Sequence, residues 1–366
     1  MSNTGFTEYK VIGLMSGTSL DGVDIAFCRF TINDSKWTYT IEVGETIAYS
    51  TEWKKSLLAL ENTDAFTFEQ THVEYGFYLG ELVANFIQKH NITADFVSSH
   101  GHTIFHQPTK KLTVQIGAGS VIAAKCNLPV VCDFRSLDVA LGGQGAPLVP
   151  IGDKLLFENF DFCLNLGGFA NISYNLPSPN GEGEGVRHAF DICPVNIVMN
   201  AICATVGKEY DNEGELASNG KLNQLLLNEL NQLPFYHLAL NSPKSLGKEW
   251  VLKNIQPLLQ KYNLAAADVL RTFCEHVSLQ IAASINDKKQ GEVFVTGGGA
   301  FNTFLMECIQ KHTVHQLIVP AKKIIEFKEA LIFAFLGVLR MRNEVNCLKS
   351  VTGATNDNCG GAVYYN

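Results

Sequence analysis

Short apolar runs with alternating polar positions recur along the chain and predict β-strands. In residues 10–30, two such runs flank a turn rich in Gly, Ser and Thr, and residues 161–176 repeat this arrangement around Gly167-Gly168. Because a strand follows each turn, both segments are predicted to be β-hairpins. Strands are predicted at 10–15, 23–30, 96–98, 130–132, 162–166, 172–175 and 293–296.

Longer segments with apolar residues at helical spacing lie among these strands. They predict helices at 67–90, 269–285 and 330–342. Strands that alternate with helices are typical of an α/β fold. Since 366 residues exceed what one hydrophobic core usually serves, we expect two domains, at 1–145 (completed by about 340–366) and at 146–340. The repeated hairpin indicates that these are related halves.

Composition restricts the class of protein further. The formal charge is −8 and no basic run exceeds Lys322-Lys323, which argues against nucleic acid or an anionic membrane as a partner. Ten scattered cysteines without a CxxC pair indicate free thiols rather than disulfides or zinc. The first ten residues lack the features of a signal peptide, and the longest apolar run, 330–339, is too short to span a bilayer. We expect a soluble, cytoplasmic protein.

Three glycine-rich turns are the candidates for a nucleotide site. Backbone N–H groups in such turns form concave sites for anionic oxygens. A Walker P-loop is excluded, because no GK[ST] sequence joins a strand to a helix here. Each hairpin turn alone is best explained as an ordinary hairpin, but the third cluster, between a strand and a helix near Asn302, favours ATP binding. The expected ATP contacts are Gly17, Thr18, Ser19, Leu20, Asp21, Gly22, Val23, Asp24, Gly167, Gly168, Asn171, Gly297, Gly298 and Gly299.

The order of these turns resembles that of the sugar kinase, heat-shock 70 and actin superfamily. The segments GLMSGTSLDGVD, SHGHTIFHQP, TVQIG, DFRSLDVALGGQGAPLVP, LNLGGFANIS and TGGGAFN look like those of the anhydro-N-acetylmuramic acid kinase family, over roughly residues 11 to 335. The resemblance implies two actin-like (ribonuclease H-like) domains with ATP in the interdomain cleft, and Mg²⁺. It implies that 1,6-anhydro-N-acetylmuramic acid is opened by water and phosphorylated at its 6-oxygen, in peptidoglycan recycling. A homodimer is expected from the resemblance only.

Asp191, in RHAFDICPVN, matches the family's catalytic aspartate. A carboxylate here would activate water for attack at the anomeric carbon. The structural alternative is that Asp191 caps the helix that follows. Family members commonly have Gly-Pro-Gly-Asn after this aspartate, whereas this chain has Cys193-Pro194-Val195-Asn196. The departure leaves open whether the sugar or the rate differs.

The remaining polar motifs supply candidate substrate contacts. Arg135 is suited to bidentate pairing with the lactyl carboxylate of a muramic acid, and an internal ion pair with Asp133 or Asp138 is equally open. For Gln115 the alternative is a hydrogen bond within a buried strand, and for Glu329 a solvated position at a helix start. The expected sugar contacts are His100, Gly101, Gln115, Arg135, Gln144 and Glu329.

A metal site within the chain is weakly supported. His100, His102 and His106 have suggestive spacing, but no carboxylate or cysteine completes a ligand set nearby, so hydrogen bonding is favoured. Asp21 is a candidate to approach Mg²⁺ through water, or it only stabilises its turn.

Two other functions stay open at this point. One is a kinase for an ordinary sugar hydroxyl, with Asp191 deprotonating that hydroxyl directly. The other is a nucleotide-gated binding protein without sugar chemistry. A serine hydrolase is disfavoured, because Ser19 lies in a GxSxD sequence that a strand follows.

Overall fold

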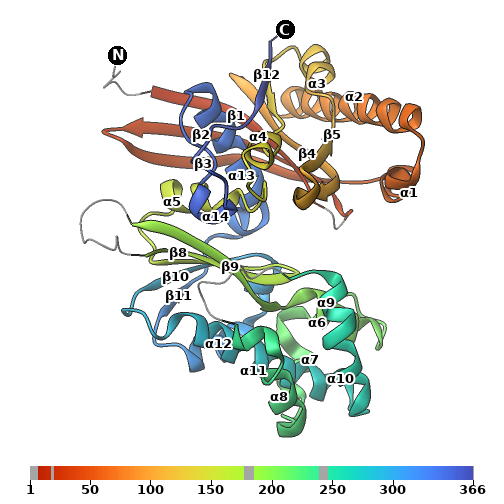
Figure 1. Cartoon of the computed structure of the whole chain (residues 1–366), viewed down its shortest axis with the longest axis vertical. Coiled ribbons are helices and arrows are strands. Elements are labelled where there is room, and N and C mark those ends of the chain that lie inside the picture. Colours follow the sequence, from red (N-terminus) through yellow and green to blue (C-terminus); the bar gives the residue numbers. More distant parts are fainter. Residues whose placement is uncertain (1–6, 18–19, 177–184, 239–245, 366) are drawn as a thin grey trace. The chain divides into compact units, whose positions relative to one another are not determined.

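The chain forms two units, each built around one β-sheet. The computed structural model describes residues 7–17, 20–176, 185–238 and 246–365. Contacts divide the chain into unit 1, Met1–Phe157 with Phe327–Asn366, and unit 2, Glu158–Glu326. Figure 1 shows the C-terminal elements α13, α14 and β12 (blue) among the N-terminal strands of unit 1 (red and orange).

The boundaries of unit 1 follow the packing of two helices, α5 (Val149–Leu156) and α13 (Lys322–Met341). The sequence suggested boundaries at 145/146 and near 340, whereas the contacts place them at 157/158 and 326/327. The reason is that α5 packs on β3 (Lys36–Ala48), and Asp153 of α5 pairs with Lys328 of α13 at 2.9 Å in a buried ion pair. Both helices therefore belong largely to unit 1.

Unit 1 has a seven-stranded mixed sheet in the order β12-β6-β4-β1-β2-β3, with β5 paired to β4. Neighbours β1–β2 and β2–β3 are antiparallel, whereas β1–β4 and β4–β6 are parallel. The remaining strands of this sheet are β1 (Thr7–Ser16), β2 (Gly22–Asn33), β4 (Phe96–Gln107), β5 (Leu112–Ile116), β6 (Val130–Cys132) and β12 (Ala362–Tyr364).

Helices cover both faces of this sheet. Ile12 and Leu14 of β1 belong to a core that also contains buried side chains of α2 and α3. Gly13 faces α13 instead, and a Cβ there would lie 2.1 Å from the Ala330 carbonyl oxygen, so the close approach of α13 requires glycine. The helices of unit 1 other than α5 and α13 are α1 (Thr51–Ala59), α2 (Ala65–His90), α3 (Gly119–Cys126), α4 (Ser136–Ala140) and α14 (Lys349–Thr352).

Unit 2 repeats the strand order of unit 1. Its sheet runs β11-β10-β7-β8-β9, with β7–β8 and β8–β9 antiparallel and β7–β10 and β10–β11 parallel. An antiparallel meander extended by two parallel strands is the ribonuclease H-like arrangement of actin-like domains. The predicted fold class and the two predicted hairpins, β1–β2 and β7–β8, are confirmed. The strands are β7 (Phe162–Leu166), β8 (Phe169–Leu176), β9 (Val186–Pro194), β10 (Glu292–Thr296) and β11 (Gln316–Ile318).

The hydrophobic core of unit 2 lies between one face of its sheet and its helices. Leu164 and Leu166 of β7 and Phe273 of α11 are buried in it. The helices are α6 (Asn196–Ala204), α7 (Glu215–Asn219), α8 (Gln224–Asn231), α9 (Lys248–Asn254), α10 (Gln256–Lys261), α11 (Ala266–Ile285) and α12 (Thr303–His312). Short 3-10 helices occur in the chain at Leu60–Asn62, Pro108–Lys110, Asn212–Gly214, Pro234–His237 and Gly298–Phe301.

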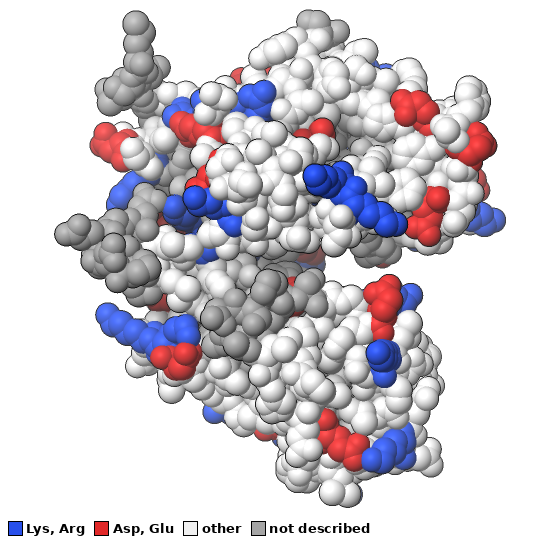
Figure 2. Space-filling view, viewed as in Figure 1, with Lys and Arg blue, Asp and Glu red and all other residues white. Residues whose placement is uncertain are grey.

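Other expectations from composition can be compared with the structure. All ten cysteines are free thiols, and most are buried. Figure 2 shows acidic and basic side chains intermingled in small groups on the face in view. Among the helices of the described residues, none has the length and apolar character that crossing a membrane requires. The composition of residues 177–185, PSPNGEGEG, predicts an exposed loop, and all of this segment but Gly185 lies outside the described residues.

Candidate active site

Four polar residues form one row across the sheet of unit 2. Thr296 is paired with Asn165, Asn165 with Asn171, and Asn171 with Asp191, on the neighbouring strands β10, β7, β8 and β9. They alternate with core residues along their strands, so their side chains lie on the face opposite the hydrophobic core. Asn171 and Asp191 were expected site residues, and the register places them directly opposite each other. The hydroxyl oxygen of Thr296 is buried without a hydrogen-bond partner among the described residues.

Asp191 is held by the chain that leads into α9. Its Oδ2 accepts a hydrogen bond of 2.8 Å from the backbone N–H of Leu246. The N-cap position of α6 is Val195, which makes no side-chain capping bond. Asp191 itself is half-buried on the polar row.

Two of the residues that depart from the family's glycine run lie in the core. The side chains of Cys193 and Val195 are fully buried in the core of unit 2. The two substitutions fill the core.

The second glycine turn binds the start of α6. The carbonyl of Gly168 accepts from the N–H groups of Val195 (2.8 Å) and Ile197 (3.3 Å), and that of Gly167 accepts from Asn196 (3.2 Å). The Asn196 side-chain Nδ2 also donates to the Leu166 carbonyl at 3.0 Å. Asn196, which the sequence analysis did not single out, thus joins the turn to the helix.

The third glycine cluster lies next to the second. A Cβ on Gly298 would lie 3.5 Å from Asn196 Nδ2, and one on Gly299 would lie 2.8 Å from the Leu166 Cβ. Glycine is required at position 297 for two reasons: its φ is +82°, and a Cβ there would lie 2.6 Å from Asn165 Oδ1. The predicted helix after this cluster is confirmed as α12, which the Asn302 side chain caps by accepting from the Leu305 N–H at 2.9 Å.

Packing does not require glycine at two of these positions. The nearest atom to a Cβ on Gly168 would be 3.9 Å away, and Gly298 is similarly open. A missing side chain in open space leaves room for a ligand to approach the backbone closely. The residues present therefore fit a nucleotide at the carboxyl ends of β7 and β10.

The first glycine turn, in unit 1, is held at both ends. Its central residues Thr18 and Ser19 lie outside the described residues, so their expected role is not described. The Leu20 N–H donates to the Gly17 carbonyl at 3.4 Å, and the Tyr49 N–H donates to the Asp21 carbonyl at 3.3 Å. Leu20 has φ +61°.

Asp21 ends this turn, and β2 begins at Gly22. Asp21 is exposed, and Asp24 accepts a hydrogen bond of 2.6 Å from the Thr46 hydroxyl. Val23 is fully buried in the core of unit 1. A Cβ on Gly22 would lie 2.2 Å from the Ile47 carbonyl oxygen, so sheet packing already accounts for glycine there.

A buried chain of hydrogen bonds joins this turn to β4 and α2. Ser16 Oγ lies 2.8 Å from His102 Nδ1 and 2.5 Å from the Tyr49 hydroxyl, which lies 2.5 Å from the Tyr75 hydroxyl. Burial lowers the pKa of His102 to about 4, so the imidazole is neutral at pH 7. If each hydroxyl donates toward His102, every proton of the chain has an acceptor and Nδ1 accepts. Of the expected histidine motif, His102 thus stabilises the first glycine turn through its hydrogen bond with Ser16.

His100 and Arg135 of unit 1 contact each other directly. Arg135 Nε and Nη2 lie 3.1 Å and 2.9 Å from His100 Nε2, and Nη1 donates to the Gly145 carbonyl at 2.6 Å. Burial, opposed by the charge of Glu329, lowers the pKa of Arg135 to about 10. Among the described residues, Arg135 forms no ion pair with Asp133 or Asp138, and its pairing with a substrate carboxylate stays a prediction.

Asp138 instead organises the loop that contains Gly145. Its Oδ2 accepts from the Gly145 N–H at 2.7 Å, and its Oδ1 accepts from the side chains of Thr352 (2.8 Å) and Asn358 (2.9 Å). The carboxylate is completely buried. The C-terminal segment and the GGQGAP loop are therefore held together by one side chain.

The other expected sugar contacts also belong to unit 1. Gly101, at φ +74°, adjoins His100, and Gln115 Nε2 donates to the Thr113 hydroxyl at 2.9 Å. The side chain of Gln144 is exposed, and its backbone N–H donates to the Thr352 carbonyl at 2.8 Å. The side chain of Glu329 reaches solvent, yet the surrounding protein and the charge of Asp24 raise the pKa of its carboxyl.

The histidines have partners within the protein. His106 Nδ1 lies 3.1 Å from the Thr113 hydroxyl, while His100 and His102 are bonded as described. Over the described ranges, no three His, Cys, Asp or Glu side chains are grouped so as to hold a metal ion.

The repeated sheet order and the glycine turns define the class of this protein, which is a two-unit α/β protein of the actin-like type. The family model for anhydro-N-acetylmuramic acid kinase matches residues 9–366. The chain is 34% identical to an anhydro-N-acetylmuramic acid kinase of Vibrio vulnificus (strain YJ016), over 98% of this chain and 99% of that protein. It is 35% identical to one of Saccharophagus degradans, over 96% and 98%. The chain belongs to the anhydro-N-acetylmuramic acid kinase family.

Among solved structures, the chain has more distant similarities. The activator of the 2-hydroxyisocaproyl-CoA dehydratase from Clostridium difficile aligns with 91% of this chain and 97% of its own, at 12% identity and a TM-score of 0.44.

Proposed function

We propose that this protein carries out the reaction for which its family is named, the ATP-dependent conversion of 1,6-anhydro-N-acetylmuramic acid to N-acetylmuramic acid 6-phosphate. The observation that carries the proposal is the position of Asp191. It lies opposite Asn171 on the polar row of unit 2, in a chain that matches the family over nearly its whole length. The reaction would serve peptidoglycan recycling.

Asp191 would act as the general base. Its carboxylate takes a proton from water, and the oxygen of that water attacks the anomeric carbon of the sugar. The bond between the anomeric carbon and the bridging oxygen breaks, and the freed 6-oxygen accepts the γ-phosphoryl group of ATP while ADP leaves. The hydrogen bond from the Leu246 N–H to Oδ2 would hold this carboxylate in place.

The glycine turns would hold the nucleotide. Gly168 and Gly298 leave room beside the backbone in unit 2, and Gly17 belongs to the first turn in unit 1. Mg²⁺ carried with ATP would neutralise phosphate charge, and Asp21 and Asp24 are the carboxylates that would approach it, through water.

Arg135 and His100 would contact the sugar. A guanidinium has five N–H groups, and three of them already bind His100 and Gly145, so two N–H groups can still donate to a carboxylate. The lactyl carboxylate of a muramic acid provides suitable acceptor oxygens. We assign Gly101, Gln115, Gln144 and Glu329 supporting contacts with the same substrate.

The test is ADP release by the purified protein with Mg²⁺-ATP, with and without 1,6-anhydro-N-acetylmuramic acid. N-acetylglucosamine and N-acetylmuramic acid, which carry a free 6-hydroxyl, are the comparison substrates. Release that depends on the anhydro sugar supports the proposal. Faster release with a free 6-hydroxyl would favour an ordinary sugar kinase, and ATP binding without sugar-dependent release would favour a nucleotide-gated binding protein.

Family membership favours the anhydro sugar over both rivals. A cytoplasmic location is part of the proposal, because the reaction consumes ATP. A homodimer is likewise proposed from the family resemblance, and light scattering in solution tests it.

A further inference from the structure

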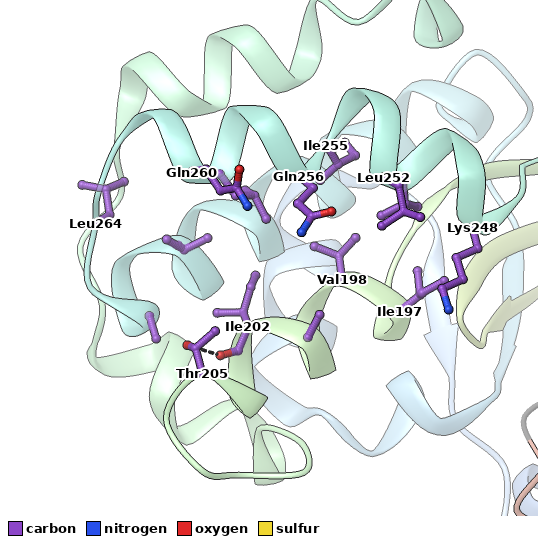
Figure 3. Close-up of a pocket in the computed structure, with 15 residues that line it drawn as sticks. Ile197, Val198, Ile202, Thr205, Lys248, Leu252, Ile255, Gln256, Gln260 and Leu264 are labelled. Atoms are coloured by element: carbon purple, nitrogen blue, oxygen red, sulfur yellow. Dashed lines mark hydrogen bonds between the residues drawn. The ribbon is translucent and has the colours of Figure 1, made fainter.

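A cavity lies within the helical part of unit 2, away from the polar row. It has a volume of about 370 Å³, within the range of sites for small organic ligands. Its walls are α6 on one side and α9–α10 on the other, with the start of α11 at one end. Figure 3 shows apolar side chains of both walls facing each other across it, among them Val198, Ile202 and Leu252.

Three polar side chains of the lining determine what kind of molecule fits. Gln256 and Gln260 extend from the α10 wall, and Lys248 lies beside Ile197 at one end of the cavity (Figure 3). Across the part of the chain that the structure describes, these three side chains have no hydrogen-bond or ion-pair partner. Lys248 is the one charged residue of the lining. The cavity therefore combines a long apolar surface with one cationic end and two amides.

Each wall of this cavity also ends at the candidate active site. The Ile197 N–H, at the start of α6, donates to the Gly168 carbonyl at 3.3 Å. On the other wall, Lys248 begins α9, and two residues earlier the Leu246 N–H donates to Asp191 Oδ2 at 2.8 Å. A molecule that fixes the separation of α6 and α9 thereby acts on the glycine turn and on Asp191.

We propose that this cavity binds a small anionic amphiphile, an apolar chain or ring with one carboxylate that pairs with Lys248, and that its binding is coupled to the candidate active site through Leu246 and Ile197. The binding stands by itself, whereas the coupling rests on the role proposed for Asp191. Coupling between two sites is reciprocal. If bound sugar raises the affinity for the amphiphile, bound amphiphile raises the affinity for the sugar by the same factor.

Decanoate is the probe, titrated by calorimetry into the full-length protein without ATP or sugar. We expect saturable binding of one molecule per chain, with 1-decanol weaker because it lacks the charge and acetate inactive because it lacks the apolar chain. Lys248→Gln should weaken binding roughly fivefold, the effect of losing an ion pair at a solvent-accessible position. Lys253→Gln, on the same helix but outside the cavity, is the matched control and should bind decanoate unchanged.

A second variant blocks the cavity without emptying the core. Ala201 lines the cavity and is exposed, so Ala201→Trp fills the space and should abolish binding with an unchanged melting temperature. Absence of saturable binding, equal binding by Ala201→Trp, or equal binding of 1-decanol and decanoate would overturn the proposed site. Competition by ATP would also overturn it, because the cavity would then belong to the nucleotide site.

The coupling is measured by repeating the titration with saturating sugar. A changed decanoate affinity, matched by an equal change in sugar affinity when decanoate is present, supports it. Unchanged affinities would overturn the coupling and leave the binding site intact. The kinase reaction needs no decanoate, so failure of the cavity proposal and failure of the proposed function give different results.

Discussion

Arg135 directs two guanidinium nitrogens at one imidazole nitrogen, since Nε and Nη2 lie 3.1 Å and 2.9 Å from Nε2 of His100. Arginine has no acceptor, so Nε2 carries no proton and Nδ1 donates to the Gly101 carbonyl at 2.9 Å. Burial and the charge of Arg135 keep the pKa of His100 well below its ordinary value. His100 therefore stays neutral and orients Arg135.

Replacing Arg135 by lysine should raise the KM for the sugar. A lysine ammonium keeps the charge but cannot bind His100 and Gly145 with a planar fork. We expect an increase of about tenfold or more, with the KM for ATP changed less than about twofold. Steady-state ADP release measures both. Arg29→Lys, in a surface ion pair with Glu8 and Glu42, is the control, and an equal effect there would contradict the assignment.

Tyr49→Phe tests whether the buried hydrogen-bond chain of Ser16, Tyr49 and Tyr75 stabilises the first glycine turn. The change removes the hydroxyl between Ser16 and Tyr75 and should cost about 1–2 kcal/mol of stability. If the turn binds ATP, the KM of the variant for ATP should rise several-fold, while its KM for the sugar stays within about twofold. Tyr9→Phe is the matched control, because it loses a hydrogen bond to Arg342 at the opposite end of β1. A rise in the sugar KM alone would contradict this role.

The local patterns in the sequence were enough to predict the hairpins, because alternation and glycine turns act within a few residues. The strands at 130–132 and 162–166 are found at those residues, and the helix expected at 67–90 is Ala65–His90. The expected helix at 330–342 begins earlier, at Lys322, with a kink at Phe327. Strands β3, β5, β9, β11 and β12 were not among the predicted ranges. Strand β12 pairs with β6, which is distant in the chain, whereas β3 and β9 pair with the strands directly before them and were missed all the same.

The residues of the candidate site, too, could be predicted only in part. Asp191 and the glycine turns could be found from motifs, whereas Leu246, 55 residues from Asp191, could not. The signal for Asn165 was present, as a polar residue within an apolar strand before Gly167. His102 was noted only for its spacing, because its partners Ser16 and Tyr49 become neighbours only when the sheet forms.

Stability should fall as the pH drops below about 6.5. Burial lowers the pKa of His100, that of His102 to about 4 and that of His276 to about 3. Below pH 6.5 these histidines bind protons in the unfolded chain but not in the folded chain. Each of them therefore lowers the free energy of unfolding by up to about 2 kcal/mol between pH 6.5 and pH 5. Glu329, whose pKa is raised, offsets part of this loss.

Urea unfolding at about pH 7 and about pH 5 measures this dependence. The carboxylates with lowered pKa, such as Glu45 and Glu275, lose their contribution below about pH 4.5 and so do not account for it. His276→Gln cannot titrate at this position and should show a shallower dependence. Equal stability at the two pH values would contradict the prediction.

Restoring a family glycine at Val195 should destabilise the protein without improving catalysis. Val195→Gly removes a fully buried side chain and adds backbone freedom, which together cost about 3 kcal/mol. The kcat and the KM for the sugar should stay within about twofold. Val314→Gly, at an exposed valine of the same unit, should cost less than about 1 kcal/mol. Faster turnover with unchanged stability would show that Val195 restricts the substrate.

The central claim is that Asp191 activates water to open the anhydro ring, and it is tested by running the reaction in ¹⁸O-water. Mass spectrometry of the product should find one ¹⁸O in the phosphorylated sugar, at the anomeric carbon. Asp191→Asn can still accept the Leu246 N–H, so it should fold normally and lose about 10²–10⁴-fold in rate. A phosphorylated product without ¹⁸O, or full activity in Asp191→Asn, would contradict the account.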